Sequence, residues 1–327
     1  MRFLFAAAAL LLCAAAQAGY EAHPRAAELL QTLARDYGFS AVELDWVRGE
    51  LAQARQIPQL IESEQQAKEK TLSWTAYRRI HLTGANVENG RAFLRKYSKS
   101  LPRAEEKYGV PKEVIAAILG VETKYGTYHS STRVLDALAT QGFDHPTRSD
   151  FFFKELAEFF VLCRERDFDP QKIRGSYAGA MGAAQFMPSN YRRLAVDFNA
   201  DGNIDLWNLQ DAIGSIARYL TEYDPERTWQ PGQAVIAPAV FDGDREDLEI
   251  NARKPKSTVA GLARAGLVAP EGLPADLPAG ALELSTDEGS QWWIGLPNFF
   301  AIMSYNPRAY YAMSVTQLAQ ALGDAPR

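Results

Sequence analysis

PKEVIAAILGVETKY, residues 111–125, is the stretch of sequence that decides the fold. It is apolar almost all round, which predicts a helix buried inside the protein. We expect the helix to start at Pro111, because proline favours the first helical turn, where its missing N–H has no helical partner to lose. Glu122 follows large apolar side chains by three, four and seven residues. Its carboxyl group is therefore predicted to lie on the same helix face as those side chains.

Glu122 is a candidate general acid/base. Partial burial disfavours the charged form of a carboxyl group, so we expect the pKa of Glu122 to be raised. A glycosidase needs such a group, still protonated near neutral pH and able to give a proton to the leaving oxygen. The spacing alone is more economically explained by a structural glutamate at a helix end, paired with Lys124 or a nearby arginine.

A second segment, GSYAGAMGAAQFMPS at residues 175–189, is dominated by small residues. Small side chains allow a helix or a ligand ring to approach the backbone closely. Ser176, Tyr177 and Gln185 are the polar exceptions, and they suit the hydroxyl and acetamido groups of a sugar. Taken alone, the segment is better explained by tight helix packing.

These two segments and several further motifs occur in one order along the chain, and together they resemble the lytic murein transglycosylase B family. The motifs are GVET (120–123), VLDALAT (134–140), GAMGAAQFMPS (179–189), DAIGS (211–215), LPNF (296–299), YN (305–306) and YAM (311–313). The resemblance covers nearly the whole chain after the first eighteen residues. The joint signal is therefore far more specific than any single motif.

The resemblance implies a mainly α protein, with a lysozyme-like core, an α domain and a small β-rich insertion. The corresponding boundaries are an α domain over 19–110, rejoined by about 298–327, a catalytic core over 111–225 and a β-rich domain over 226–297. Helical periodicity independently predicts helices over 151–166, 187–196, 209–223 and 314–322. Short apolar runs between Pro, Gly and Asp predict strands near 234–237, 282–284 and 292–294.

The resemblance also implies a reaction. It is cleavage of the β-1,4 bond between N-acetylmuramic acid and N-acetylglucosamine in peptidoglycan glycan strands, without water. The C6 hydroxyl of the muramic acid closes on C1 and leaves a 1,6-anhydro end. Glu122 would protonate the leaving oxygen and then take the proton of the C6 hydroxyl. Ordinary glycosidases use two carboxylates, and no obvious second acid accompanies these motifs.

Two alternatives stay open. The first is a lysozyme-like muramidase, a hydrolase of the same bond that uses water and a second acid. The second is a non-catalytic, calcium-stabilised protein that binds peptidoglycan, for which Glu122 would be dispensable.

Substrate-binding positions are carried over from the family one by one. They are Ser176, Gln185 and Phe186 in the small-residue segment, and Tyr77, Arg148, Tyr219, Tyr305, Asn306 and Tyr311 elsewhere. Arg148 matches one of two adjacent arginines in the family pattern, and Thr147 stands in place of the other. Phe151 stands where the family often has an aromatic hydroxyl, which removes a hydrogen bond.

A loop of calcium-binding type is a separate strong signal. The segment DFNADGNID, residues 197–205, places oxygen ligands at loop positions one, three and five, glycine at six and a backbone carbonyl at seven. Asn208 stands at position twelve in place of the usual glutamate, and Asp211 is the closing carboxylate that the resemblance implies. The expected ligands of a structural calcium ion are thus Asp197, Asn199, Asp201, Asn203 and Asp211. An acidic, Asx-rich turn without an ion is the alternative, and no organic cofactor is expected.

The bulk composition excludes one class of partner. The chain has 327 residues and a net charge of -5, from 35 Lys and Arg against 40 Asp and Glu. A mildly acidic balance argues against nucleic acid, because phosphate binding needs a basic surface. It permits a polymer such as a glycan.

The first eighteen residues predict a cleaved signal peptide, because an apolar run leads to the small-x-small pattern Ala16-Gln17-Ala18. The run is too short to span a bilayer comfortably, and no other segment is long and apolar enough. Cys13 follows Leu12, which is too bulky for a lipoprotein site. We therefore expect export to the periplasm without a lipid anchor. Only Cys163 remains after cleavage, so no internal disulfide is expected.

Overall fold

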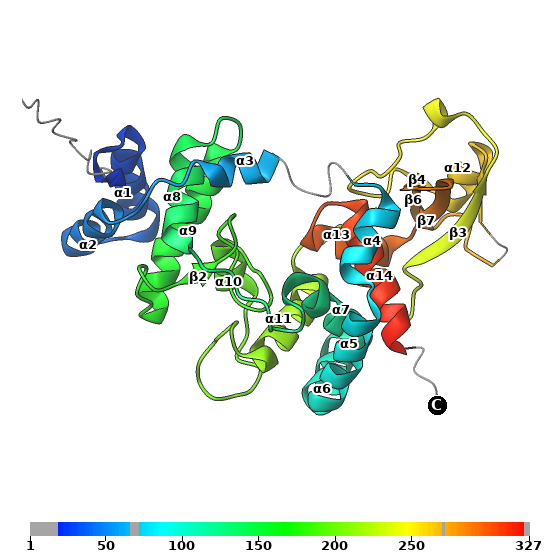
Figure 1. Cartoon of the computed structure of the whole chain (residues 1–327), viewed down its shortest axis with the longest axis horizontal. Helices are drawn as coiled ribbons and strands as arrows, with labels where there is room; N and C mark the ends of the chain where they lie inside the picture. The colour runs from blue at the N-terminus through cyan, green and yellow to red at the C-terminus, as the bar shows by residue number, and fades with distance from the viewer. Residues whose placement is uncertain (1–18, 66–71, 270–271, 324–327) are drawn as a thin grey trace, which may run out of the picture.

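The computed structural model describes residues 19–65, 72–269 and 272–323 (Figure 1). The predicted signal peptide, which includes Cys13, lies outside the described residues and stays a prediction. Within the described ranges, none of the helices combines the length and the apolar character that crossing a membrane requires. The chain is mainly helical with a small antiparallel sheet, as predicted.

Helices make up most of the regular elements. The helices are α1 (Pro24–Tyr37), α2 (Ala41–Ala52), α3 (Gln59–Gln65), α4 (Trp74–His81), α5 (Gly84–Lys96), α6 (Ser100–Tyr108), α7 (Lys112–Thr123), α8 (Val134–Asp144), α9 (Ser149–Arg166), α10 (Pro188–Leu194), α11 (Leu209–Glu222), α12 (Val259–Arg264), α13 (Pro297–Tyr305) and α14 (Ala309–Gly323), with short 3-10 turns η1 (Tyr20–Ala22) and η3 (Arg245–Asp247). The strands are β1 (Thr132–Arg133), β2 (Arg174–Gly175), β3 (Ile236–Phe241), β4 (Ser257–Thr258), β5 (Leu267–Val268), β6 (Pro278–Thr286) and β7 (Gly289–Gly295).

The predicted buried helix is α7, whose residues from Val114 to Gly120 are all buried. Pro111 is the cap residue just before it. Helix α10 is shorter than predicted at both ends, because Met187 and Ala195 have extended backbone. Helix α14 begins earlier than predicted, at Ala309. The pattern of apolar residues therefore located these helices well and their ends less well.

The β-rich part is a five-stranded antiparallel sheet in the order β4-β6-β7-β3-β5. A strand was predicted near residues 234–237, and strand β3 begins within this run, at Ile236, and continues to Phe241. Trp292 and Trp293 are neighbours on β7 and point to opposite faces, as alternation along a strand requires. Trp293 packs against the main core, and Trp292 packs against the small core on the other face, with its ring 4.3 Å from that of Phe241.

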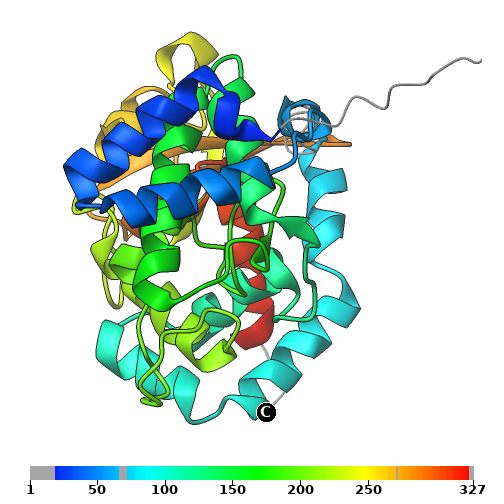
Figure 2. The ribbon, with the colours of Figure 1, turned by 90° about the vertical axis from the view of Figure 1, so that its left-hand side faces the viewer.

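The helices between residues 19 and 108 pack in two places. Helix α1 contacts α9, and helix α3 contacts α8. Figure 2 shows the blue helices α1 and α2 lying across the green helices. Helices α4, α5 and α6 instead contact α7, α11 and α14, on the other side of the molecule (Figure 1). The predicted domain boundaries stay a prediction. Helix α7 is covered on several sides by these contacts and is therefore held firmly.

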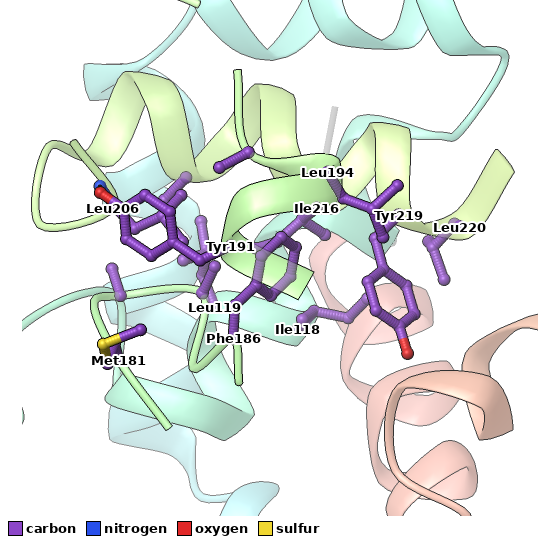
Figure 3. Close-up of a cluster of buried hydrophobic side chains, with 14 of the residues drawn as sticks. Ile118, Leu119, Met181, Phe186, Tyr191, Leu194, Leu206, Ile216, Tyr219 and Leu220 are labelled. Atoms are coloured by element: carbon purple, nitrogen blue, oxygen red, sulfur yellow. The ribbon is translucent and has the colours of Figure 1, made fainter. Parts of the chain in front are cut away.

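Most buried side chains belong to one hydrophobic core, whose members run along the chain from Tyr20 to Leu322. Figure 3 shows its centre, where Phe186 of the small-residue segment lies close to Ile118 of α7 and Ile216 of α11. This core places the small-residue segment directly against the end of α7.

Candidate active site

Glu122 stands on the last turn of α7 and is half-buried. Tyr311 of α14, which is 2% exposed, donates a hydrogen bond from its hydroxyl to Oε1 of Glu122 at 2.6 Å. Helix α14 packs along α7 and so brings together two residues that are 189 positions apart. The carboxyl group is therefore held in a defined orientation by a buried donor.

Tyr311 is one of a group of neighbouring tyrosines. Its ring is stacked on that of Tyr305, with centroids 6.4 Å apart and planes inclined by 8°. The Tyr219 ring lies 4.6 Å from that of Tyr305. Burial, and next the negative charge of Glu122, raise the pKa of Tyr305 and of Tyr311 well above the usual range. Both hydroxyls therefore keep their protons and stay hydrogen-bond donors at physiological pH.

The chain turns sharply just after the carboxylate. Lys124 and Tyr125 both have left-handed backbone, with φ of 49° and 61°. The Tyr125 side chain fills the space between two helices. A β-carbon added at Gly90 would lie 2.3 Å from its hydroxyl oxygen, and one added at Gly120 would lie 2.6 Å from its ring. Glycine is thus required at both positions for the close approach. The buried Tyr125 fixes the end of α7 and with it the position of the carboxyl group.

The small-residue segment lies beside this turn. Thr123 donates from its hydroxyl to the Ala183 carbonyl at 3.2 Å, and Tyr305 donates from its hydroxyl to the Ala184 carbonyl. Ser176 and Gln185 are half-buried and line a cavity of about 900 Å³. Side chains from three separate parts of the chain thus meet at the end of α7.

Ser176 and Gln185 are held by their own turns. Ser176 Oγ accepts from the Ala180 N–H at 3.0 Å, and Gln185 Nε2 donates to the Gly182 carbonyl at 2.8 Å. Gln185 also has positive φ, 51°, which is uncommon for a residue with a side chain. This strained position aims a polar side chain at the cavity.

Phe186 and Tyr219, which we expect to contact sugar, lie under the site instead of on its surface. They are 1% and 3% exposed, with ring centroids 5.4 Å apart (Figure 3). The Tyr219 hydroxyl donates to the Ser304 carbonyl at 2.8 Å. Both rings support Tyr305 from below, and their direct contact with substrate stays a prediction.

The other predicted binding residues surround this centre at different depths. Tyr77 is buried at 2% exposure and packs against Tyr310 of α14, with centroids 5.8 Å apart. Asn306 directly follows α13 and is half-buried. Arg148 directly precedes α9, with its guanidinium 5.1 Å from the centre of the Phe151 ring. Arg148 thus lies at the start of α9, which contacts α1 and α8, whereas Glu122 lies on α7, which contacts α5, α6 and α14.

A family model for the transglycosylase SLT domain matches residues 21–320. The chain belongs to the transglycosylase SLT domain family. It is 38% identical, over 309 residues, to the membrane-bound lytic murein transglycosylase B of Escherichia coli, covering 92% of this chain and 83% of the relative. The catenated lytic transglycosylase SltB1 from Pseudomonas aeruginosa superposes with a TM-score of 0.85 at 39% identity, over 94% of this chain and 99% of that one. As a member of this family of lytic murein transglycosylases, the protein is an enzyme.

The predicted calcium loop of this transglycosylase is an exposed turn between α10 and α11. Asp197 accepts bonds from the backbone N–H groups of Asp201 at 3.1 Å and Gly202 at 2.9 Å. Asp201 accepts from the N–H of Asn203 at 2.9 Å. Gly202, at loop position six, has φ of 89°, as the sharp turn of such loops requires. The carboxylates are thus turned toward the interior of their own loop.

Asp211 holds the loop together from below. It is fully buried, and its two carboxylate oxygens accept from the N–H groups of Phe198 at 2.8 Å, Asn199 at 3.1 Å and Asp205 at 2.9 Å. Asn208, at loop position twelve, caps the start of α11. The position of Asp211 explains the loop geometry without an ion, and its role as a direct ligand stays a prediction.

The residues of the loop fit calcium by their chemistry. Among the described residues, no three His, Cys, Asp or Glu side chains are grouped as metal ligands, and the loop instead offers a mixture of Asp, Asn and backbone oxygens. Such hard oxygen donors are the ligands that Ca²⁺ prefers. The lytic transglycosylase Slt35 of Escherichia coli, solved in complex with calcium, is similar to this chain with a TM-score of 0.81 at 37% identity, over 94% and 96% of the two chains.

His81 is a neighbour of the site that was not predicted from the sequence. Its ring lies 5.2 Å from that of Tyr77, four residues earlier on α4, and this spacing was the available signal. Burial, and next the positive charge of Lys124, lower the pKa of His81 to about 4. The imidazole is therefore neutral at physiological pH.

Proposed function

We propose that the enzyme is a lytic transglycosylase that cleaves the β-1,4 bond between N-acetylmuramic acid and N-acetylglucosamine in peptidoglycan. The products are strands with 1,6-anhydro-muramic acid ends, and Glu122 is the single acid/base. The observation that carries the proposal is the buried donor on the carboxyl group, the Tyr311 hydroxyl at 2.6 Å from Oε1 of Glu122.

In the first step, protonated Glu122 gives its proton to the oxygen that links the two sugars, while the bond from C1 to this oxygen breaks. The carboxylate that forms is stabilised by Tyr311, whose proton stays in place because its pKa is raised by burial and by the charge of Glu122. Such a fixed donor needs no rearrangement as charge develops.

In the second step, the same carboxylate removes the proton of the C6 hydroxyl, and O6 forms a bond to C1. Glu122 is protonated again at the end, so no water and no second acid are consumed. Hydrolytic glycosidases instead use two carboxyl groups about 5–9.5 Å apart.

Mass analysis of purified murein digested by the enzyme tests the proposal. We expect anhydro ends, which are lighter by one water than the reducing ends of a hydrolase. A Glu122→Gln protein should lose activity by about 10³-fold or more, because general acid/base catalysis contributes about 10²–10⁴-fold per step. Reducing ends would show a muramidase, and full lytic activity of Glu122→Gln would show that this carboxyl is not the acid/base.

The proposal also assigns roles to the N-terminal segment, the domains and the calcium-type loop. Residues 1–18 direct export to the periplasm, where the glycan strands are the partner, and Cys13 carries no lipid. A lysozyme-like core over 111–225 performs the chemistry between the α domain and the β-rich domain over 226–297. Calcium in the loop 197–205 is structural, held by Asp197, Asn199, Asp201, Asn203 and Asp211, because the loop is built of oxygen donors and lies outside the tyrosine group.

A further inference from the structure

We propose that a second cavity, on the side of α4 away from Glu122, binds a short peptide that carries both a free carboxylate and a free ammonium group. The cavity lies between α4, α14 and the turn that joins β6 to β7, and Figure 1 shows α4 (cyan) and α14 (red) side by side. Its volume of about 660 Å³ is within the usual range for small-ligand sites, about 300–1,000 Å³. The proposal rests on the proposed function only for one source of such a peptide, the branches of murein.

This cavity is separate from the site at Glu122. Helix α4 presents Tyr77 to Tyr310 of α14, with ring centroids 5.8 Å apart. The cavity is lined instead by other residues of α4, among them Thr75 and Arg79. Two positions along a helix correspond to a rotation of about 200°, so Thr75 and Arg79 lie on the face opposite to Tyr77. None of the residues assigned above to the glycan is among the described residues that line this cavity.

The lining carries opposite charges at its two ends. Arg78 and Arg79 stand in the last turn of α4 and bring two guanidinium groups. Asp287 and Glu288 form the turn between β6 and β7 and bring two carboxylates. The backbone N–H of Asp287 donates to Thr75 Oγ1 at 3.2 Å, which places this turn beside the start of α4. A ligand along the cavity therefore meets carboxylates at one end and guanidinium groups at the other.

The separation of these charges suits a peptide of two to three residues. Asp287 also accepts from Ser73 Oγ at 3.4 Å, so the carboxylate end is level with residues 73–75 of α4. A helix rises about 1.5 Å per residue, which puts Arg79 about 6–9 Å further along the axis. An extended peptide covers about 3.3 Å per residue. Its ammonium and carboxylate groups can thus reach the two ends at once.

The charged groups are held in place by neutral partners. Nε of Arg78 donates to Oε1 of Gln317 on α14 at 2.8 Å, and the Asp287 carboxylate accepts from the hydroxyl of Ser73. These bonds orient the side chains but do not neutralise their charges. Each charge therefore remains able to bind an oppositely charged group of a ligand. A preformed surface of this kind avoids much of the ordering cost of binding.

Amide side chains complete the lining between the two ends. Gln317 and Gln320 come from α14, and Gln291 comes from β7. An amide both donates and accepts hydrogen bonds, which is the pattern that a peptide backbone requires. A neutral sugar could use these amides but would leave the four charges without partners. The combination therefore selects a peptide with charged ends.

Calorimetric titration with trialanine, a peptide with one free ammonium and one free carboxylate group, tests this site. We expect Arg79→Gln to weaken binding about tenfold, which is the size of one lost charge-assisted contact. Arg79 is exposed, so the change should leave the fold intact. Arg95→Gln is the matched control, because Arg95 is an exposed arginine of α5 that pairs with Glu88 at 3.3 Å, and it should bind trialanine as the wild type does.

Blocked forms of the peptide test which end meets which wall. Amidation of the carboxylate should weaken binding to the wild type about tenfold and to Arg79→Gln little further, because the same contact is already lost. Acetylation of the ammonium group should behave likewise with Glu288→Gln. Wild-type protein that does not bind trialanine, or an Arg79→Gln protein that binds it equally well, would overturn the proposal.

The source of the peptide is separated by a comparison of glycan strands in a Glu122→Gln protein. If Arg79→Gln weakens the binding of strands that carry peptides and not of peptide-free strands, the ligand is a branch of murein. If both kinds of strand bind equally and trialanine still responds to Arg79→Gln, the ligand is a released peptide. None of these measurements needs turnover. An enzyme that released no anhydro ends would therefore contradict the proposed function and leave the trialanine result unchanged.

Discussion

The end of α7 and the loop over residues 197–205 both fix carboxylates in space, but by opposite means. At the end of α7, the buried Tyr311 donates to one half-buried carboxyl, and the buried Tyr125 packs against the helix that carries it. In the loop, the half-buried side chains of Asp197 and Asn199 accept from backbone N–H groups of the loop, and the buried Asp211 holds the ends. Packing fixes the first geometry without any ion. The second geometry brings several carboxylates together and is favoured by a cation.

This contrast predicts different sensitivities. The end of α7 should respond to changes of side-chain volume and to loss of single hydroxyl groups, whereas the loop should respond to ions. Four experiments separate the two responses.

The largest effect is expected for Tyr311→Phe. The ring stays and Glu122 loses its donor, so kcat should fall about 100-fold while the melting temperature changes little, as for other preorganised donors. Tyr310→Phe, one position earlier on α14, is the matched control, because its hydroxyl accepts from the Ser285 N–H at 3.3 Å instead. An unchanged kcat for Tyr311→Phe would show that the donor is not needed.

Gly120→Ala should be the most destabilising of the small changes. Its β-carbon would lie 2.6 Å from the Tyr125 ring, and overpacking of this kind costs about 1–3 kcal/mol of unfolding free energy. Gly49→Ala on α2 is the control, because nothing lies within 4 Å of its added carbon and alanine favours a helix interior. If both variants have the same unfolding free energy in urea, the close packing of Tyr125 against Gly120 is contradicted.

Removal of calcium should lower the melting temperature by a few degrees, roughly the effect of 1–2 kcal/mol in a chain of this size. Calcium should restore it, and an Asp197→Ala protein should show no response to chelator. A wild-type melting temperature that a chelator leaves unchanged would argue that the Asx-rich loop holds itself without an ion.

The last effect concerns acid stability near the site. The folded protein protonates His81 only at a pKa of about 4, whereas the ordinary value is 6.5. Between these values the unfolded chain binds more protons, so stability falls as the pH drops from about 6.5 to 4. His81→Gln should remove this part of the pH dependence of unfolding free energy, measured in urea at several pH values. An identical slope in both proteins would contradict the burial of a neutral imidazole.

The sequence was sufficient for features that depend on local pattern. The burial of α7 on all sides follows from residues 114–120 alone. The turn at Gly202 follows from its place in the calcium-type loop. The family resemblance correctly indicated the class of enzyme, because ordered motifs carry more information than composition.

Features that depend on distant packing could not be predicted. The Tyr125 ring fits between helices only because Gly90 and Gly120 lie opposite each other, which no local pattern shows. Phe186 and Tyr219 are buried, although an aromatic residue in a motif has the same pattern whether it lines a cleft or supports it. Asp211 has the right chemistry for a ligand, yet its oxygens accept three backbone hydrogen bonds.

The hydrogen bond between Tyr311 and Glu122 also orders events during synthesis. The tyrosine is made 189 residues after the glutamate, so every nascent chain that has not yet reached α14 lacks the donor on the proposed acid/base. Incomplete chains should therefore be inert toward murein. A wall-cutting enzyme assembled in this order gains its activity only once almost the whole chain is in place.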